Sequence, residues 1–426
     1  MRGLWFLVRR SLRQHILSTV ITVLAVALAS GLVMAVFSIN TQTHKAFTGG
    51  ETGFDAVLGA RGSPLQLVLN TIFHLETSPG NIPWSLYQEI KRDPRVKLAI
   101  PYAVGDNYLG FRVVGTTPEI FTDFEYRKGT KFRVQGHDPA NPDGPRIFDP
   151  ELREAVIGSY VAQKTGLRFG SVFSPYHGID FREKAQHGEQ YVVVGVLEPT
   201  NSPSDRVIWI PIEGIYRMGG HYLRGAGEDY EAKPEEEIPD EHKEVSSVML
   251  KFRGGKMVGM RLVEDINTRG KVATLAYPIG EVMAELFQKL GWVTRILTLV
   301  AYLVVAVATG SILASIYNTM NERRREFAIL RALGARRATV FSVIVAEAVS
   351  IAALGSALGI VVCGCILWGA AVVVRAQTGV VLDPFTYHTA LVATPAGMLL
   401  LGALAGLLPA FKAYSTDVAE NLAPQS

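Results

Sequence analysis

The chain has 426 residues, of which 48% are hydrophobic and 19% are charged, and its formal net charge is +3. Its two cysteines, Cys363 and Cys365, are separated by one residue in an apolar run. On a helix they would point in different directions, which excludes a disulfide between them and leaves none for the rest of the chain. We expect both to be small apolar fillers rather than metal ligands.

Four segments of the chain are long, apolar and nearly free of charge. Residues 16–39, 296–317 and 389–411 carry no charged side chain, and residues 338–374 carry only Glu347. A helix needs about 20 apolar residues to cross a bilayer. The pattern therefore predicts four transmembrane helices, the third long enough to tilt or to project beyond the bilayer. The first is too long for a cleaved signal peptide, and we interpret it as a retained span.

Basic residues gather at one set of the predicted membrane boundaries. Arginines precede the first span, six more lie between the second and third spans, and Lys412 follows the fourth. Because cytoplasmic segments carry the excess of Lys and Arg, we expect both termini in the cytoplasm and residues 40–291 outside. A short second outer loop is expected near residues 375–388. We expect a multi-pass protein of a bacterial inner (cytoplasmic) membrane that contacts lipid and no nucleic acid.

The long outer segment mixes strand-like and helical patterns. Stretches typical of strands occupy residues 97–104, 111–117, 190–199, 206–212 and 245–252. Amphipathic or helical patterns occupy residues 63–75, 84–94 and 153–167, and Pro94 and Gly166 end the last two. The fold class is therefore an α-helical membrane protein with four transmembrane helices and a large periplasmic mixed α/β domain between the first and second. The expected boundaries are 1–40, 41–285 and 286–426.

An acidic stretch, residues 226–244, interrupts this outer domain. From Glu228 to Glu244 it carries nine acidic residues and two lysines, with almost nothing apolar. Such a composition cannot bury enough surface to offset the entropy of ordering. We expect a mobile surface loop, and the alternative is a docking segment for a basic partner.

The outer domain shows no catalytic pattern. G-x-S-x-G, H-E-x-x-H and paired C-x-x-C motifs do not occur in the sequence, so we expect no enzyme and no catalytic residue. His177 and His187 flank Asp180 and Glu183. That spacing is compatible with a metal site, but scattered surface histidines are commoner, and our expectation is no metal.

An arginine-rich segment, residues 321–334, separates the second and third spans. Thr319-x-x-Glu322 matches a capping box at a helix start, and Gly334 is a typical helix stop. Between them lies an apolar stripe of Phe327, Ile329, Leu330 and Leu333. A voltage sensor is rejected because the arginines lie outside the apolar runs. Two interpretations remain: a loop that lies on anionic lipid, or an amphipathic helix that fits a groove on a cytoplasmic partner.

The whole of this segment, "NTMNERRREFAILRALGARRATVFSVIVAEA" at residues 318–348, resembles the signature of FtsX/MacB-like permeases of ABC transporters, the mechanotransmission type (type VII). "VIGSYVAQKTGLRFGSVF" at 156–173 resembles an outer-domain segment of that family, and "LLPAFKAYSTDVAENL" at 407–422 resembles its ending. The order of one span, a large outer domain and three spans also matches.

The resemblance implies a permease subunit that works as a pair, a homodimer or a dimer with a related permease, together with a pair of ATPase subunits. The residues that would contact the ATPase form a coupling helix: Asn321, Glu322, Arg323, Arg324, Arg325, Glu326, Phe327, Leu330, Arg331 and Gly334. Because G-x-x-x-x-G-K-[ST] does not occur in the sequence, we expect no cofactor in this chain, with ATP and Mg in the partner.

The expected task is export, or extraction of a substrate or lipoprotein at the inner membrane, with a periplasmic adaptor or a lipoprotein as a further partner. The alternative is a membrane-anchored sensor or regulator of periplasmic enzymes that signals through the cytoplasmic helix.

The spans themselves carry three signals. Gly355-x-x-x-Gly359 and Gly402-x-x-x-Gly406 predict close helix packing. A carboxylate in a span is costly, so Glu347 should face protein, water or the arginines and tie helices together rather than relay protons. From Gly280 a proline-free helical pattern enters the second span. We expect one rod from the outer domain to the coupling helix, with Gly291 as its weak point.

Overall fold

The fold is given by a computed structural model, which describes residues 2–48, 53–178, 181–219, 223, 237–383 and 386–415. It divides into two compact units. The first, the membrane unit, comprises residues 1–43, 290–373 and 382–426, and the second, the outer unit, comprises residues 44–289 and 374–381. The sequence did not predict that residues 374–381 belong with the outer unit.

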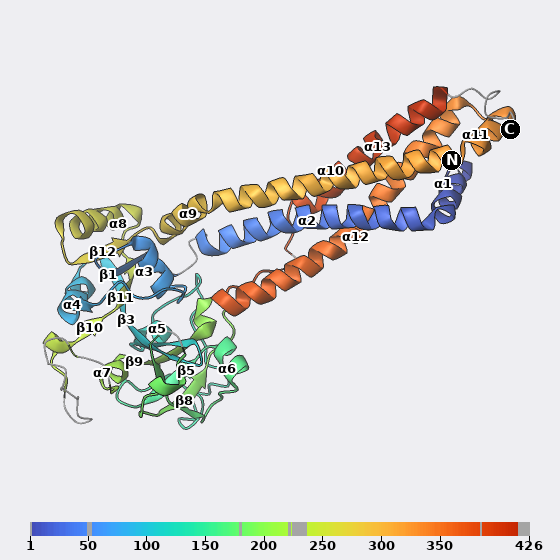
Figure 1. The fold of residues 1–426 in the computed structure, drawn as a ribbon. Coiled ribbons are helices and arrows are strands. Elements are labelled where there is room, and N and C mark those ends of the chain that lie inside the picture. The colour runs from blue at the N-terminus through green and yellow to red at the C-terminus, as the bar shows by residue number, and fades with distance from the viewer. Residues whose placement is uncertain are drawn as a thin grey trace. The chain divides into compact units, whose positions relative to one another are not determined.

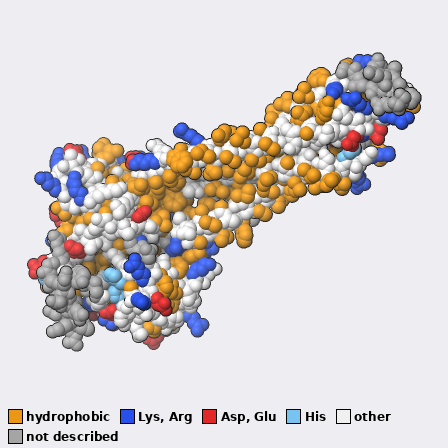
Figure 2. Space-filling model, in the orientation of Figure 1, with side chains coloured by type: hydrophobic (Ala, Val, Ile, Leu, Met, Phe, Trp, Pro, Cys, Tyr) orange, Lys and Arg blue, Asp and Glu red, His pale blue; other side chains and the backbone are white. Residues whose placement is uncertain are grey.

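The membrane unit is built from helices (Figure 1). Their bounds are α1 Arg2–Gln14, α2 Ile16–Thr48, α10 Gly291–Glu322, α11 Arg324–Ala332, α12 Arg337–Thr378 and α13 Ala390–Ser415. The four helices α2, α10, α12 and α13 are long and apolar enough to cross a membrane, which confirms the four predicted spans. Figure 2 shows hydrophobic side chains along these helices. Leu303 on α10 and Val361 on α12 are 58% and 60% exposed, as expected of side chains that face lipid.

The predicted continuous rod is interrupted twice. Helix α9, Ile279–Lys289, ends one residue before α10 begins, and Leu290 forms the turn between them. The break lies beside Gly291, a residue type that weakens helices because it has the most conformational freedom to lose. At the other end of α10, Arg323 separates it from α11. The segment is therefore three helices in succession.

The outer unit contains a ten-stranded mixed sheet. The strands are β1 Ala56–Ala60, β3 Val96–Tyr108, β4 Phe111–Thr116, β5 Glu154–Ile157, β6 Val172–Phe173, β7 Tyr176–His177, β8 Tyr191–Val196, β9 Val207–Pro211, β11 Ser247–Phe252 and β12 Ala273–Ala276. Their order is β12-β1-β11-β3-β4-β9-β5-β8-β6, with β7 paired to β3. β4 pairs β9 and β5 pairs β8 in parallel, and the other pairs are antiparallel. A separate pair joins β2, Ile82–Pro83, to β10, Glu244–Val245.

Short helices accompany the sheet. They are α3 Pro64–Thr71, α4 Trp84–Arg92, α5 Glu119–Thr122, α6 Ser159–Thr165, α7 Ile212–Tyr216 and α8 Lys256–Val263, with single turns η1 Glu183–Ala185, η2 Pro203–Arg206 and η3 Asp240–His242, and a π-helical stretch, η4 Glu264–Arg269. Alternate residues of the strands enter two apolar cores. Leu58, Ile157 and Ile208 belong to one, and Val57 and Trp209 belong to the other. The mixed α/β prediction is confirmed.

One predicted helix is half strand. Within residues 153–167, Glu154–Ile157 form β5, with all four residues buried, and only Ser159–Thr165 form the helix α6. Gly158 stands between the two elements. A Cβ there would collide with the backbone of Asp205, so only glycine lets the Asp205 backbone approach the chain this closely. Gly166 ends α6 in a left-handed conformation at φ 75°, as the sequence predicted.

The end of the acidic stretch contacts the rest of the outer unit, where the composition predicted a mobile loop. Residues 226–236 lie outside the described part of the chain, but within residues 237–244 the side chains of Ile238 and Lys243 are buried. Ile238 is only 2% exposed, and the Lys243 ammonium lies 2.9 Å from the Glu213 carboxylate. The Trp84 N–H donates to the Lys243 carbonyl at 3.0 Å. The end of the segment thus contacts the outer unit through one apolar side chain and one lysine, although its average composition predicts a loop.

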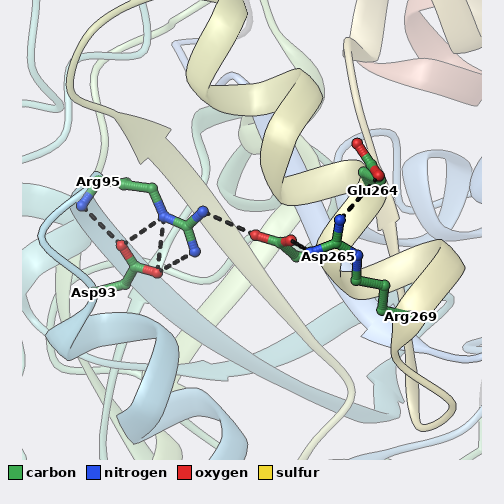
Figure 3. Close-up of polar contacts among 5 residues, drawn as sticks. All are labelled: Asp93, Arg95, Glu264, Asp265 and Arg269. Carbon is green, nitrogen blue, oxygen red and sulfur yellow. Dashed lines mark hydrogen bonds and ion pairs between the residues drawn. The ribbon is translucent and has the colours of Figure 1, made fainter.

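A network of charged side chains joins the start of β3 to η4 (Figure 3). The Arg95 guanidinium contacts Asp93 at 2.8 Å and Asp265 at 3.0 Å, and Arg269 contacts Asp265 and Glu264. The hydrogen bond with Arg95 lowers the pKa of Asp93. Arg95 bridges two carboxylates that are distant in sequence, so the network fixes the π-helical stretch against the sheet.

Residues 374–381 complete the outer unit. Val374 and Val380 pack against its core, and Val380 is 7% exposed. The Arg206 guanidinium donates to the Gln377 carbonyl. Gly379 has φ 75°, and a Cβ there would lie 2.8 Å from the Ser202 carbonyl oxygen. This segment was expected to be the end of a span and a short exposed loop.

Candidate coupling site

The helix α11 forms where the sequence predicted a coupling helix, but its first turn differs. Thr319 and Glu322 lie in the last turns of α10, as does Asn321, so they cap no helix start. Arg323 is the N-cap of α11 and makes no side-chain capping bond. The capping-box prediction was therefore wrong. The apolar run of the second span extends its helix through Thr319, which leaves no free N–H group there for a cap to satisfy.

The end of α11 is the predicted glycine stop. Gly334 has φ 100°, a backbone conformation that residues other than glycine adopt only at an energetic cost. Its N–H donates to the Arg331 carbonyl at 3.0 Å, and the Ala335 N–H donates to the Leu330 carbonyl at 3.0 Å. This pair of bonds is a Schellman motif, which satisfies two carbonyls at the helix end. The end of α11 is therefore well defined.

The predicted apolar stripe divides between two faces. Phe327 is 8% exposed, and Leu330 packs against the core of the membrane unit. Ile329 and Leu333 are 44% and 81% exposed. Leu330, which was expected to enter a partner's groove, is half-buried against the core of this chain. The surface left for a partner is apolar at Ile329 and Leu333.

The exposed face of α11 is also basic. Arg324 and Arg325 are exposed, Arg331 is half-buried, and Glu326 is exposed. The Glu326 carboxylate accepts from Arg323 Nε at 3.0 Å. This acid therefore steadies the start of the helix, while the two exposed arginines set the charge of its surface.

A buried polar cluster fixes α11 to two other helices. The Ser11 hydroxyl on α1 donates to Glu347 Oε1 on α12 at 2.7 Å and accepts from Arg323 Nη1 at 2.5 Å. Arg323 Nη1 also lies 3.7 Å from Glu347 Oε2. Ser11 is fully buried, and Arg323 and Glu347 are each 5% exposed. The Glu347 carboxylate thus contacts Ser11 on α1 and Arg323 at the start of α11.

Glycines bring the long helices into contact. A Cβ at Gly355 would lie 2.5 Å from the Val26 side chain on α2, and one at Gly359 would collide with the Ser30 hydroxyl. On α13, a Cβ at Gly402 would lie 2.7 Å from Ala352, and one at Gly406 would lie 2.8 Å from Ala348. Both G-x-x-x-G pairs therefore lie at helix contacts, the first against α2 and the second against α12.

Comparison with known families decides the identity of the chain. The MacB-like periplasmic core domain matches residues 19–258, which is more than half of the chain, and the FtsX-like permease C-terminal domain matches residues 298–418. The chain belongs to the FtsX/MacB-like permease family. The resemblance seen in the sequence is confirmed.

Curated relatives match this FtsX/MacB-like permease over a limited length. The chain is 27% identical over 238 residues to the macrolide export ATP-binding/permease protein MacB of Shewanella sp. (strain W3-18-1), and equally to that of Shewanella oneidensis. Each match covers 54% of this chain and 33% of the relative. The matched part of this chain thus spans about a third of the length of these relatives.

Two solved structures are similar to the permease. One is the periplasmic region of MacB from Actinobacillus actinomycetemcomitans, at 9% identity and a TM-score of 0.33, covering 56% of this chain and 94% of that one. The other is the extracellular domain of the noncanonic ABC-type transporter YknZ from Gram-positive bacteria, at 17% identity and a TM-score of 0.29, covering 52% and 98%.

The sequence did not single out α1 of the permease as part of this site. The signal was present: Leu4, Val8, Ser11 and His15 recur at helical spacing, and the structure turns Val8 and Ser11 inward. The His15 Nδ1 atom lies 3.1 Å from Glu322 Oε2 at the end of α10. The arginines of α1 predict its orientation, but the face that packs inward lies between them.

Proposed function

We propose that this permease is the membrane subunit of an ABC transporter, and that the exposed face of α11 is where an ATP-binding cassette subunit docks. The observation that carries the proposal is the exposure of Leu333 and Ile329 on a helix fixed at both ends. A helix that presents apolar side chains between exposed arginines suits a groove with an apolar floor and an acidic rim. A helix that only lay on lipid would need neither the Schellman end nor the buried cluster.

The cluster at Arg323 suggests how a movement of the partner would be transmitted. Ser11, Arg323 and Glu347 come from three segments and are packed together without exposed members. A force on α11 would therefore move α1 and α12 with it, because separating them leaves charged groups buried and unpaired. The chain continues from α12 into residues 374–381 of the outer unit, so we propose that the outer unit is the part driven.

The remaining assignments follow from the family. We propose that ATP and Mg²⁺ are bound by the cassette partner, that two permease copies or two related permeases assemble with two such partners, and that both permease termini are cytoplasmic. The work done at the outer unit is export, or extraction of a substrate or lipoprotein from the inner membrane. A periplasmic adaptor or a lipoprotein is then the outer partner.

The docking proposal is tested with Leu333→Asp. Leu333 is 81% exposed, so the permease should still fold and insert. Burying an unpaired carboxylate in a groove is costly, and we expect at least a tenfold loss of the cassette subunit that copurifies with the permease from detergent-solubilised membranes. Leu333→Met, which keeps an apolar side chain of similar size, should retain the partner.

Leu333→Lys separates docking from lipid contact. A lysine strengthens attraction to anionic lipid but is excluded from an apolar groove, so docking predicts that it loses the partner as Leu333→Asp does. If Leu333→Asp keeps the partner, the docking surface is wrong. If a partner other than an ATPase is captured through this face, the sensor function replaces the transporter function.

A further inference from the structure

The outer unit brings two histidines and an aspartate together on β3 and β7. In the antiparallel pairing of these strands, Asp106 stands directly opposite His177. The chain then returns through η1 to His187, whose N–H donates to the Pro175 carbonyl at 2.9 Å. His187 Nε2 lies 3.1 Å from Asp106 Oδ1, and His177 Nδ1 lies 3.5 Å from the same oxygen.

The sequence had paired these histidines with other acids. Asp180 lies outside the described residues, and Glu183 lies on the exposed turn η1. The acid that contacts both rings is Asp106, which lies 81 residues before His187. The pairing of β3 with β7 brings Asp106 next to His177, so the spacing of residues in the sequence could not predict this contact.

We propose that Asp106, His177 and His187 bind a divalent transition metal ion, with Zn²⁺ as the preferred ion. Two imidazole nitrogens and one carboxylate oxygen are ligands that Zn²⁺ takes at about 2.0–2.1 Å, commonly as three protein ligands with a fourth position left open. In a tetrahedral site those bond lengths place neighbouring ligand atoms about 3.3 Å apart. The observed 3.1 and 3.5 Å fall on either side of that value, and all three ligand atoms lie within 4.8 Å of one another.

The surroundings hold the three ligands in position. The Asp106 side chain is fully buried and that of His187 is 5% exposed, whereas that of His177 is 54% exposed. The Asn107 amide donates to the Gly178 carbonyl at 2.9 Å, and the Gly178 N–H donates to the Gly105 carbonyl at 2.8 Å, which secures the loop that carries the histidines. A ring nitrogen of His187 also hydrogen-bonds the backbone of Gly219, the kind of outer contact that orients metal-binding imidazoles.

The arrangement leaves one side of the site open to solvent. Two ligands are buried and His177 is the exposed one, so a water molecule or a group from outside the chain can take the fourth position. The competing role is a metal-free contact in which a protonated His187 pairs with Asp106, and the hydrogen bond with Asp106 does raise the pKa of His187. The two roles differ in whether Zn²⁺ binds.

The test uses the full chain in detergent micelles, purified through a tag without histidine, stripped with EDTA and freed of the chelator. Titration with Zn²⁺ against a chromogenic chelator should show one tightly bound ion per chain. Zn²⁺ should also raise the unfolding temperature, because it binds the folded protein. His177→Ala should weaken this binding at least tenfold, with unchanged elution on size exclusion.

Two further variants make the result decisive. His137 is an exposed histidine of the same unit, and His137→Ala should bind Zn²⁺ as the unaltered chain does. His177→Asp, which keeps a ligand atom, should bind more tightly than His177→Ala. The proposal is overturned if the folded, unaltered chain takes up no Zn²⁺, or if His177→Ala binds one ion with undiminished affinity.

Discussion

His74 is held beside two arginines in the outer unit. Its ring lines a small cavity with Arg112 and Arg206. Burial, with the charges of Arg112 and Arg206 adding to it, lowers the pKa of His74 to about 3. Its backbone adopts φ 56°, in the left-handed region where asparagine is among the better tolerated residues. The ring is therefore neutral in the folded protein at every pH that a bacterium normally meets.

This predicts a loss of stability in acid. An unfolded histidine takes up a proton near pH 6.5, whereas folded His74 takes one up only near pH 3. Its contribution is fully present above pH 6.5 and is lost as the pH falls toward 3, by about 2 kcal/mol at pH 5. His74→Asn should flatten the pH dependence of the unfolding temperature between pH 7 and 5. His137→Asn is the control, and an equal change in both variants would contradict the assignment.

A second prediction concerns the stability contributed by the buried pair Arg323 and Glu347. Removing one member of a buried ion pair leaves a charge uncompensated and costs about 3–5 kcal/mol. Glu347→Ala should lower the free energy of unfolding by an amount near the lower end of that range, because Glu326 still contacts Arg323. Glu322→Ala is the control, since that carboxylate is 64% exposed and such contacts contribute about 0–1 kcal/mol.

The double variant tests the coupling of this pair. Replacing Arg323 with Met and Glu347 with Leu together removes both charges, so the unfolding temperature should recover much of the loss seen in Glu347→Ala. Additive losses in the double variant would show that the two side chains do not depend on each other.

Among the elements, α12 offers a matched pair of glycines. Gly359 lies against α2, where a Cβ would collide with Ser30, but nothing lies within 4 Å of a Cβ at Gly364. Gly359→Ala should therefore lower the free energy of unfolding by about 1–3 kcal/mol, the usual range for overpacking. Gly364→Ala should be neutral or stabilising, because alanine favours a helix by about 1 kcal/mol. Thermal unfolding in one detergent compares the two, and equal effects would show that α12 does not pack on α2 through Gly359.

Whole elements were predictable from sequence where one signal dominates. Long uncharged runs placed the four spans, and β-branched runs placed five of the ten strands of the main sheet, β3, β4, β8, β9 and β11. The misassigned elements were short. The composition of residues 154–157 fits a helix or a strand, and only their place between β9 and β8 makes them a strand. The side chain of Leu330 could not be oriented from α11 alone, because the stripe continues around the helix and tertiary packing decides which part is covered.

For the whole molecule, the orientation in the membrane is a prediction that can be measured. Ala140 of the outer unit is exposed and Ala335 follows α11. In a chain whose two cysteines are replaced by alanine, a cysteine at Ala140 should react with a membrane-impermeant maleimide in cells with a permeabilised outer membrane. One at Ala335 should react only after detergent lysis. The opposite pattern would place α11 outside the cell and exclude a cytoplasmic ATPase at that face.

Because residues 374–381 belong to the outer unit, no continuous fragment of residues 44–289 contains the whole of it. A fragment of residues 44–289 would lack Val380 from its core and would leave Arg206 without the Gln377 carbonyl. We expect such a fragment to bind a hydrophobic dye and to unfold at a lower temperature than one in which a flexible linker appends residues 374–381. A synthetic peptide of that segment should raise the unfolding temperature of the first fragment as the peptide concentration rises, so residues 374–381 act toward the outer unit as a tethered ligand.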